Sequence, residues 1–221
     1  GLLRMTGAQK WTWRTLFQPI WYAILAIYFQ WGVAIQDLKL GRWFKGRMPK
    51  GELTQRAAPF IKKARSQLFK DYVLFPLLAF WNIPRVLLGN ALANLIRSLW
   101  TNAIIFCGHF TSDAQVYTKA ETVNESRGAW YLRQIQGSSN LEGSRYFHVL
   151  TGHLSHQIEH HLFPDIPAPR YADMAPRVRE ICQKYGVHYN SAGFWQQYAG
   201  VLWRIGKYAL PIGRRARHEP A

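Results

Sequence analysis

Histidines are concentrated in one short stretch of this chain, where their spacing could bind a metal ion. Four of the 8 histidines among 221 residues lie within nine residues of the string HLSHQIEHHLFPDIP, which runs from residue 153 to residue 167. Converging neutral imidazoles suit iron, zinc, copper or nickel better than calcium or magnesium. If the stretch is helical, spacings of three and four place the following side chains on one helix face: His153, His156, Gln157, His160 and His161.

The same letters allow a second chemistry. The pentapeptide HQIEH at residues 156–160 matches the inverted zinc-protease motif H-x-x-E-H. In that interpretation His156 and His160 bind zinc, and Glu159 is the general base. Glu180 is the candidate for a third ligand. A membrane zinc metallopeptidase is therefore one hypothesis for this chain.

Two apolar stretches are long enough to enter a membrane. Thr15–Ile35 contains about 21 residues without a charge, and as a helix it would extend roughly 31 Å, which is enough to cross a bilayer core. A second stretch, Tyr72–Gly108, is broken by NIPR at Asn82–Arg85. Tryptophan and tyrosine residues in and beside both stretches are typical of interfacial aromatic belts. The sequence predicts an all-α protein with membrane segments at about residues 15–35 and 72–108.

Positive charge is concentrated between these two stretches. The chain has 28 Lys+Arg and 12 Asp+Glu, and Asp37–Lys70 holds ten of the basic residues and two of the acidic ones. Short basic loops favour the cytoplasmic side and bind anionic headgroups. If this loop and the histidines are both cytoplasmic, Tyr72–Gly108 must be a hairpin broken at Pro84. The alternative is a single crossing by Val86–Gly108 with the basic loop outside.

Arg97 lies inside the second apolar stretch, in the string ANLIRSLW. A charged residue in a membrane helix costs ~2.5–3.5 kcal/mol on insertion scales and usually faces a protein interior or a polar cavity. A long basic side chain can instead extend to the lipid interface. We therefore expect Arg97 to line a polar cavity or to contact lipid.

The longer string GHLSHQIEHHLFP resembles the third histidine box of membrane fatty acid desaturases. It has the variant form Q-x-x-H-H, made here by Gln157, His160 and His161. The string IFCGHFTSDAQVYT, which begins at residue 105, is similar to the segment that closes the last membrane helix of this family and supplies one more histidine to the metals. That histidine is His109 in this chain.

The resemblance extends to both sides of the box. The stretch that leads into it, Gly137–His153, includes an N-x-E motif at Asn140–Glu142 that is similar to the family. After the box, FPDIPAPRYADMAPRVREICQKYGVHYN matches a turn and then an amphipathic helix. The apolar face predicted for that helix consists of Tyr171, Met174, Val178, Ile181 and Tyr185, and Gly186 is expected to end it.

The resemblance implies an enzyme with two iron ions that uses dioxygen and two electrons to introduce a double bond into a long acyl chain. His160 and His161 would be iron ligands, and His109 would be a further one. Gln157 would be a weak ligand or would orient one.

The remaining polar residues have weaker implied roles. His153 and His156 are less secure ligands, because the variant box needs histidine at neither place. Asn140 and Glu159 would support the ligands by hydrogen bonds, and Glu159 is expected to accept from an imidazole N–H.

The two earlier boxes of the family, H-x-x-x-H and H-x-x-H-H, have no counterpart here, because no histidine precedes His109. The resemblance therefore implies the C-terminal part of one desaturase domain, inactive alone, whose di-iron centre needs ligands from missing N-terminal boxes. Its parts would be the two membrane segments, the basic loop at 37–70, a cytoplasmic helical cap at 109–190 that carries the metal site, and a basic tail at 191–221. The expected location is an integral membrane one, with the metal site on the cytoplasmic side.

The expected partners follow from the same resemblance. They are a long-chain acyl-CoA or acyl-lipid substrate, membrane lipids, and an electron donor that is a b-type cytochrome or a ferredoxin with its reductase. The basic loop or the tail at Arg204–His218 could dock an acidic donor, and either could equally bind headgroups or the phosphates of a coenzyme A thioester. We expect no nucleic acid partner. The third hypothesis, a non-enzymatic basic protein of membrane surfaces or nucleic acids, predicts no metal dependence.

Overall fold

The structure is a computed structural model that describes residues 13–118 and 120–210. These residues form two compact units. One contains the described residues up to Tyr22 and from Ala103 onward, and the other is Ala23–Asn102. The boundaries fall inside two helices, α2 (Gln18–Ile27) and α7 (Ile83–His109). Residues 211–221 of the predicted basic tail lie outside the described residues.

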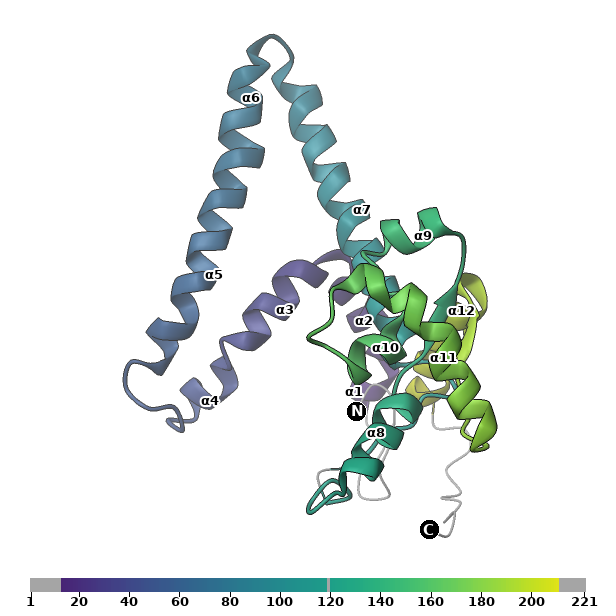
Figure 1. The fold of residues 1–221 in the computed structure, drawn as a ribbon. Helices are drawn as coiled ribbons and strands as arrows, with labels where there is room; N and C mark the ends of the chain where they lie inside the picture. Colours follow the sequence, from purple (N-terminus) through teal and green to yellow (C-terminus); the bar gives the residue numbers. More distant parts are fainter. Residues whose placement is uncertain (1–12, 119, 211–221) are drawn as a thin grey trace. The chain divides into compact units, whose positions relative to one another are not determined.

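The unit Ala23–Asn102 is entirely helical in its regular structure (Figure 1). It continues α2 and contains α3 (Phe29–Asp37), α4 (Leu40–Phe44), α5 (Glu52–Phe69), the π-helical turn η1 (Lys70–Leu74), α6 (Phe75–Leu78), the 3-10 turn η2 (Phe80–Asn82) and the first part of α7. The predicted basic segment at 37–70 is thus mostly helical instead of an irregular loop, and its place between two membrane segments stays a prediction. Its sequence from Glu52 to Phe69 is rich in alanine, leucine, glutamine, lysine and arginine, which are strong helix formers.

The apolar stretches are divided differently from the prediction. The first is split into α1 (Trp13–Leu16), α2 and α3. In the second, Glu52–Leu78 and Phe80–His109 meet at a bend of 97°. Pro84 lies in the first turn of α7, where its missing N–H would have no helical partner. Within the described residues no single helix is long and apolar enough to cross a membrane, and this bent pair is the one combination that could by length and composition.

Polar side chains join α3, α5 and α7 inside this unit. Gln30 Nε2 donates to Gln67 Oε1 at 2.7 Å, and Gln67 Nε2 donates to Asn94 Oδ1 at 3.1 Å. Asn94 Nδ2 in turn donates to Oδ2 of the buried Asp71 at 3.1 Å. The exposed Arg97 guanidinium also donates to Asn94 Oδ1. Arg97 thus lies beside a polar cluster, and its contact with lipid stays a prediction.

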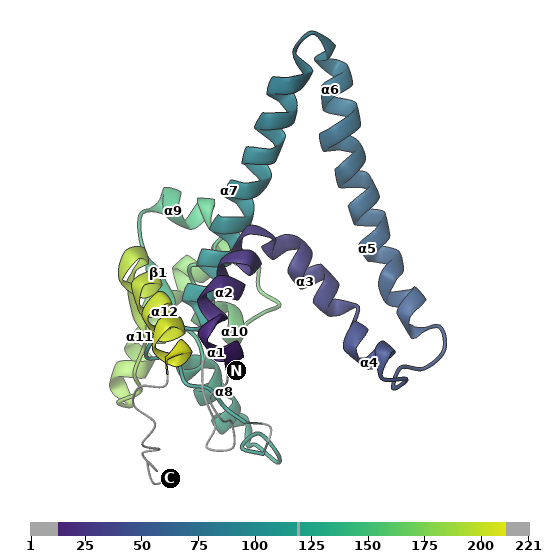
Figure 2. The same cartoon turned by 180° about the vertical axis from the view of Figure 1, so that it is seen from behind.

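The other unit contains the histidines. Its remaining elements are α8 (Arg127–Gln136), β1 (Asn140–Glu142), α9 (Arg145–Leu150), α10 (Gln157–Leu162), the 3-10 turn η3 (Ala168–Arg170), α11 (Tyr171–Lys184), β2 (Ser191–Gly193) and α12 (Phe194–Ala209) (Figure 2). The two strands pair in parallel, with Asn140 opposite Ser191. Ile158 and Leu162 of α10 pack with Val178 and Cys182 of α11 in a buried apolar cluster. The described fold is mostly helical, as predicted, and these three-residue strands are its exception.

The predicted amphipathic helix after the box is confirmed as α11. It ends in a Schellman motif, in which Val187 N–H donates to Cys182 O at 2.8 Å and Gly186 has a φ of +65°. The predicted apolar face is only partly right. Tyr171 and Val178 are buried, whereas Ile181 and Tyr185 are 45% and 71% exposed. Cys182 takes the inward position, because the buried face follows i, i+4 from Val178.

Candidate metal centre

The histidine-rich stretch is not one helix. Gly152 and His153 have φ values of +61° and +60°, and α10 begins only at Gln157. Residues in the left-handed region cannot continue a right-handed helix. The prediction of one helix face from His153 to His161 is therefore wrong for His153 and His156. It is right for Gln157, His160 and His161.

Three predicted ligands converge between the end of α7 and α10. Gln157 Nε2 lies 3.1 Å from His109 Nε2 and 3.4 Å from His161 Nε2. The His109 and His161 rings stand almost perpendicular, with centroids 5.0 Å apart. The Nε2 atoms of the two rings therefore both lie next to the Gln157 side-chain amide.

The surroundings keep these imidazoles neutral. The pKa of His109 is lowered to about 4, chiefly by burial and then by His161 and His160. The pKa of His161 is also lowered by burial and by His160. A metal ligand must be unprotonated. Both histidines therefore have the protonation state that a metal requires at neutral pH.

These residues fit one side of an iron centre. Two imidazole nitrogens and an amide that can turn its oxygen toward them are suitable ligands for iron. Within residues 13–118 and 120–210, no three His, Cys, Asp or Glu side chains are grouped closely enough to hold a metal ion. The described residues thus supply a partial set of ligands, and they do not enclose a metal by themselves.

His160 is oriented by a tyrosine that sequence reasoning did not single out for the site. Its Nδ1 lies 3.2 Å from the hydroxyl of Tyr171, which also donates to the Phe163 carbonyl at 3.3 Å. Because the Tyr171 hydroxyl donates its proton to the Phe163 carbonyl, its oxygen accepts a hydrogen bond from His160 Nδ1–H. Nε2 is then the nitrogen that His160 can offer to a metal.

A buried carboxylate fixes the start of α10. Glu159 is 0% exposed, and its two oxygens accept from Asn140 Nδ2 at 2.7 Å and from the Tyr189 hydroxyl at 2.8 Å. Asn140 Oδ1 accepts from Ile158 N–H at 2.9 Å. Burial raises the pKa of Glu159, and the two hydrogen bonds oppose that rise. Glu159 was expected to accept a hydrogen bond from an imidazole, but its two bonds come from Asn140 and Tyr189. His156 Nδ1 lies 4.0 Å from Glu159 Oε2, which is too far for a hydrogen bond.

His153 and His156 lie with a third histidine instead of with His109. The His156 ring lies against the His148 ring at a tilt of 34° with centroids 4.5 Å apart, and His148 Nδ1 bonds Ser155 Oγ at 2.7 Å. Among the described residues, buried His156 Nε2 and His153 Nδ1 have no hydrogen-bond partner. The structure thus brings together three of the six predicted ligands, His109, Gln157 and His161, and it places His160 in the same short helix as the last two. The ligand role of each residue stays a prediction.

Replacing Gly108 with alanine is expected to disturb the site, because an added Cβ would lie 2.9 Å from Gln157 Cγ and 3.2 Å from Gln157 Cδ. Overpacking of this kind typically costs about 1–3 kcal/mol of unfolding free energy. Chemical denaturation should detect that loss, and metal affinity should fall with it.

Gly89→Ala is the matched control in the same helix, since its Cβ would meet nothing within 4 Å. It should leave stability unchanged or raise it by up to about 1 kcal/mol. Equal losses in both variants would show that Gly108 is not needed for the approach of α7 to Gln157.

The unfolding free energy of the metal-free protein is expected to fall as the pH drops from about 6.5 toward 4. The pKa values of His109 and His156 are lowered to about 4 in the folded protein, and an unfolded histidine has a pKa near 6.5. In that window the unfolded chain binds protons that the folded chain refuses, so stability is lost on acidification. The raised pKa of Glu159 opposes part of this loss.

Denaturation curves between pH 7 and pH 4 would measure this effect. His109→Asn should flatten the pH dependence, and the exposed His188→Asn should leave it unchanged. An identical slope in wild type and His109→Asn would contradict the assignment.

Comparisons with known proteins show which family this chain is similar to. The model of the family described as fatty acid desaturase matches residues 3–193. The NADPH-dependent stearoyl-CoA 9-desaturase of Mycobacterium tuberculosis is 44% identical over 216 residues, which are 96% of this chain and 50% of that protein. Human fatty acid desaturase 3 is 32% identical over 130 residues, 59% of this chain and 27% of that protein. No solved structure matches. The chain spans about half the length of its mycobacterial relative, and it belongs to the fatty acid desaturase family.

Proposed function

We propose that this chain is the part of a membrane-bound fatty acyl desaturase that carries the third histidine box. The whole protein would introduce a double bond into the long acyl chain of an acyl-CoA, with dioxygen and two electrons, at a di-iron centre. The observation that carries this proposal is the convergence of His109 with Gln157 and His161. The mycobacterial relative, named a stearoyl-CoA 9-desaturase, supports the reaction and the acyl-CoA substrate.

The residues of this chain would hold one side of that centre. Two bound irons would activate dioxygen, which is the oxidant needed to break unactivated C–H bonds. His109 and His161 would offer neutral Nε2 atoms, Tyr171 would orient His160, and Gln157 would complete this side. We propose that the remaining ligands come from the two upstream histidine boxes that the family resemblance implies.

Hydrogen bonds on the buried side of α10 would hold this helix in place. Glu159, Asn140 and Tyr189 tie the helix to β1 and to the segment before β2. Because α10 carries three of the proposed ligands, this tie would keep them aligned while the acyl chain binds.

The remaining parts of the proposal concern location and electrons. The protein would be integral to the membrane, with the metal site on the cytoplasmic side. The name of the mycobacterial relative includes NADPH dependence. A reductase with a ferredoxin, or a b-type cytochrome, would pass the electrons to this protein. The basic residues of α4 and of the segment between α4 and α5 are the proposed docking region for such an acidic donor.

The peptidase hypothesis has less support from the geometry. Its general base, Glu159, is fully buried, and both of its carboxylate oxygens accept hydrogen bonds from Asn140 and Tyr189. A general base must reach the proton of a metal-bound water. Its third ligand, Glu180, is exposed and paired with Arg177 at 2.8 Å. This arrangement favours the desaturase over the metallopeptidase.

The test uses membranes that contain the natural full-length protein. Deuterium-labelled stearoyl-CoA, NADPH and the host electron donors are added, and the acyl products are analysed by mass spectrometry. The expected result is a monounsaturated product that forms in air and does not form without oxygen. Peptide hydrolysis that continues without oxygen, with no unsaturated product in air, would contradict the proposal.

A further inference from the structure

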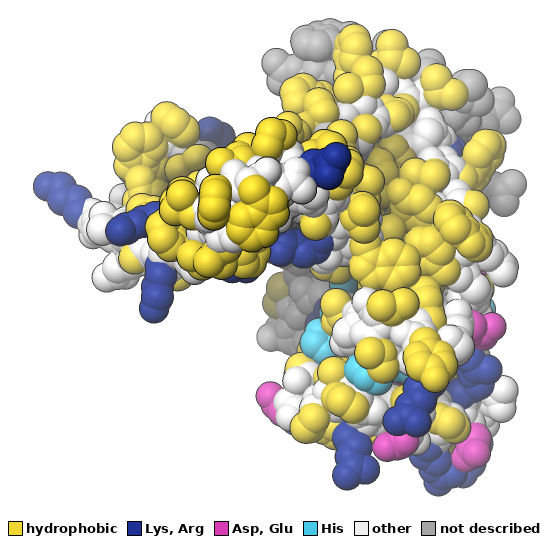
Figure 3. Space-filling model, turned by 90° about the horizontal axis from the view of Figure 1, so that it is seen from above, with side chains coloured by type: hydrophobic (Ala, Val, Ile, Leu, Met, Phe, Trp, Pro, Cys, Tyr) yellow, Lys and Arg dark blue, Asp and Glu magenta, His cyan; other side chains and the backbone are white. Residues whose placement is uncertain are grey.

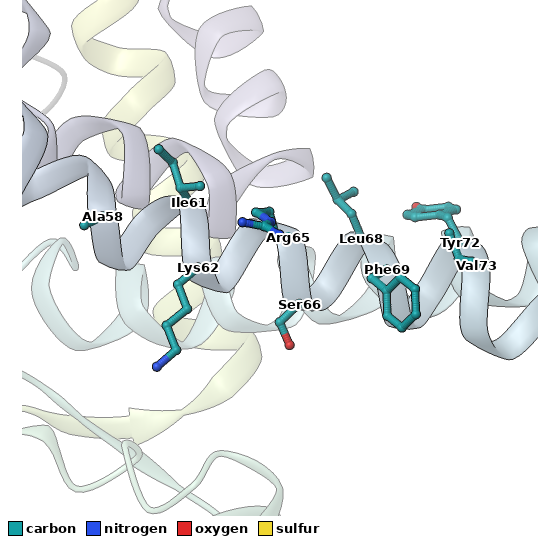
Figure 4. A pocket seen from close by; sticks show the side chains of 9 residues that line it. All are labelled: Ala58, Ile61, Lys62, Arg65, Ser66, Leu68, Phe69, Tyr72 and Val73. Atoms are coloured by element: carbon teal, nitrogen blue, oxygen red, sulfur yellow. The ribbon is translucent and has the colours of Figure 1, made fainter.

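One face of α5 and η1 is basic at one end and apolar at the other. Side chains at helical spacing line an open hollow along this face (Figure 4): Ala58, Ile61, Lys62, Arg65, Ser66, Leu68, Phe69, Tyr72 and Val73. Lys62 and Arg65 belong to its first half, and the aromatic and aliphatic residues fill the second half. Phe69 is 57% exposed and Leu68 is 49% exposed. Large apolar side chains that are this exposed over one continuous face indicate a contact surface.

The opposite side of the same helix is already occupied. Gln67 bonds Asn94 of α7 and Gln30 of α3. Phe60 makes an edge contact with Trp31, with ring centroids 6.2 Å apart. Lys62, Arg65 and Phe69 line the first hollow only, whereas Leu68 and Tyr72 also line a second hollow that they share with residues of α2, α3 and α7.

The two charges on this face have no acidic partner within the described part of the chain. The ion pairs among the described residues are made by other side chains. Neither Lys62 nor Arg65 lies within 4.0 Å of a described carboxylate. The residues that line the hollow include no acid. The face thus offers two positive charges that favour an anionic ligand.

The sequence that follows indicates a lipid as that ligand. The thirteen residues from Tyr72 to Pro84 carry no charge. Leu77, Leu78, Phe80 and Trp81 in this run are 63–74% exposed, and hydrophobic side chains cover the end of the bent pair, with Lys and Arg projecting from its flanks (Figure 3). An acidic protein would match the charges and leave this apolar run in water. An anionic lipid matches both parts, because its charged headgroup continues into an acyl chain.

We propose that this face binds an anionic phospholipid of the bilayer. The phosphate lies against Lys62 and Arg65, and an acyl chain runs along Leu68 and Phe69 toward Val73. The inference rests on the membrane location that is part of the proposed function.

The test titrates the detergent-purified full-length protein with phosphatidylglycerol and with phosphatidylcholine of the same acyl length, and native mass spectrometry counts the bound lipid. A basic residue near a membrane surface contributes roughly a fivefold gain in affinity for anionic lipid, so two contribute about 25-fold. Lys62→Gln/Arg65→Gln should lose that preference. Lys45→Gln/Arg47→Gln removes the same charge from exposed positions off this face and should keep it. Leu68→Gln/Phe69→Gln should weaken the binding of both lipids.

Three results would overturn the inference: equal affinity of the wild type for both lipids, equal losses in the two charge variants, or competition by inorganic phosphate as strong as that by phosphatidylglycerol. Extraction of cell membranes with alkaline carbonate separates this failure from failure of the proposed location. Release of the protein by carbonate would show that it is not integral to the membrane, which would contradict the proposed function. A chain that stays in the membrane pellet and shows no lipid preference would refute this inference alone.

Discussion

Replacing Glu159 with alanine is expected to lower the unfolding free energy by about 3 kcal/mol. The change leaves the Asn140 amide and the Tyr189 hydroxyl without their acceptor, and each buried unpaired group costs roughly 1–3 kcal/mol. A cavity at a fully buried position adds to the loss. Burial of the carboxylate is unfavourable and raises its pKa. The alanine variant has no such carboxylate, so this gain offsets part of the loss in unfolding free energy. Chemical denaturation of the purified protein would measure the difference.

Two further variants give this measurement its controls. Glu159→Gln keeps the shape and one acceptor oxygen, so it should cost about 1 kcal/mol. Glu180→Ala removes a carboxylate of the same length whose ion pair with Arg177 is exposed, and it should change stability by less than about 0.5 kcal/mol. If Glu159→Ala were as mild as Glu180→Ala, the buried network would not hold α10.

Replacing His161 or His109 with alanine is expected to reduce oxygen-dependent desaturation by the full-length protein more than 100-fold. Both residues direct Nε2 toward Gln157, and loss of a direct ligand should exceed the 10–100-fold losses that follow loss of a ligand's supporting partner. Tyr171→Phe removes only the hydroxyl beside His160 and should fall within that smaller range. The assay is conversion of labelled stearoyl-CoA, with iron content measured on the same samples.

His188→Ala is the control for this series, because that side chain is exposed and lies outside the converging group. It should leave conversion unchanged. Near-normal conversion by His109→Ala with a normal iron content would show that His109 is not a ligand.

The sequence predicted the shared helix face of Gln157, His160 and His161, because that face follows from local spacing. Gln157, His160 and His161 belong to one short helix, and α11 follows from its apolar periodicity and from Gly186. The pairing of His109 with α10 came from the family resemblance. No helical period could show it, because 48 residues separate His109 from Gln157.

Other features depend on backbone conformation and on distant contacts. The left-handed turn at Gly152 and His153 directs His156 toward His148, and only the glycine hinted at that turn. Tyr189 contacts Asn140 across 49 residues of sequence, so its role as a donor to Glu159 had no local signal. Gly108 did carry a signal, since a glycine beside a ligand histidine in an apolar helix indicates close approach of another segment.

The metal itself is the most direct test of the proposed centre. Elemental analysis and X-ray absorption at the iron edge can be made on the purified full-length protein, on His109→Ala/His161→Ala and on His188→Ala. The account predicts bound iron with nitrogen and oxygen neighbours and an imidazole scattering pattern in wild type and His188→Ala. It predicts loss of iron from the double variant. Zinc in place of iron, or iron that the double variant retains with the same imidazole pattern, would contradict a centre built on His109, Gln157 and His161.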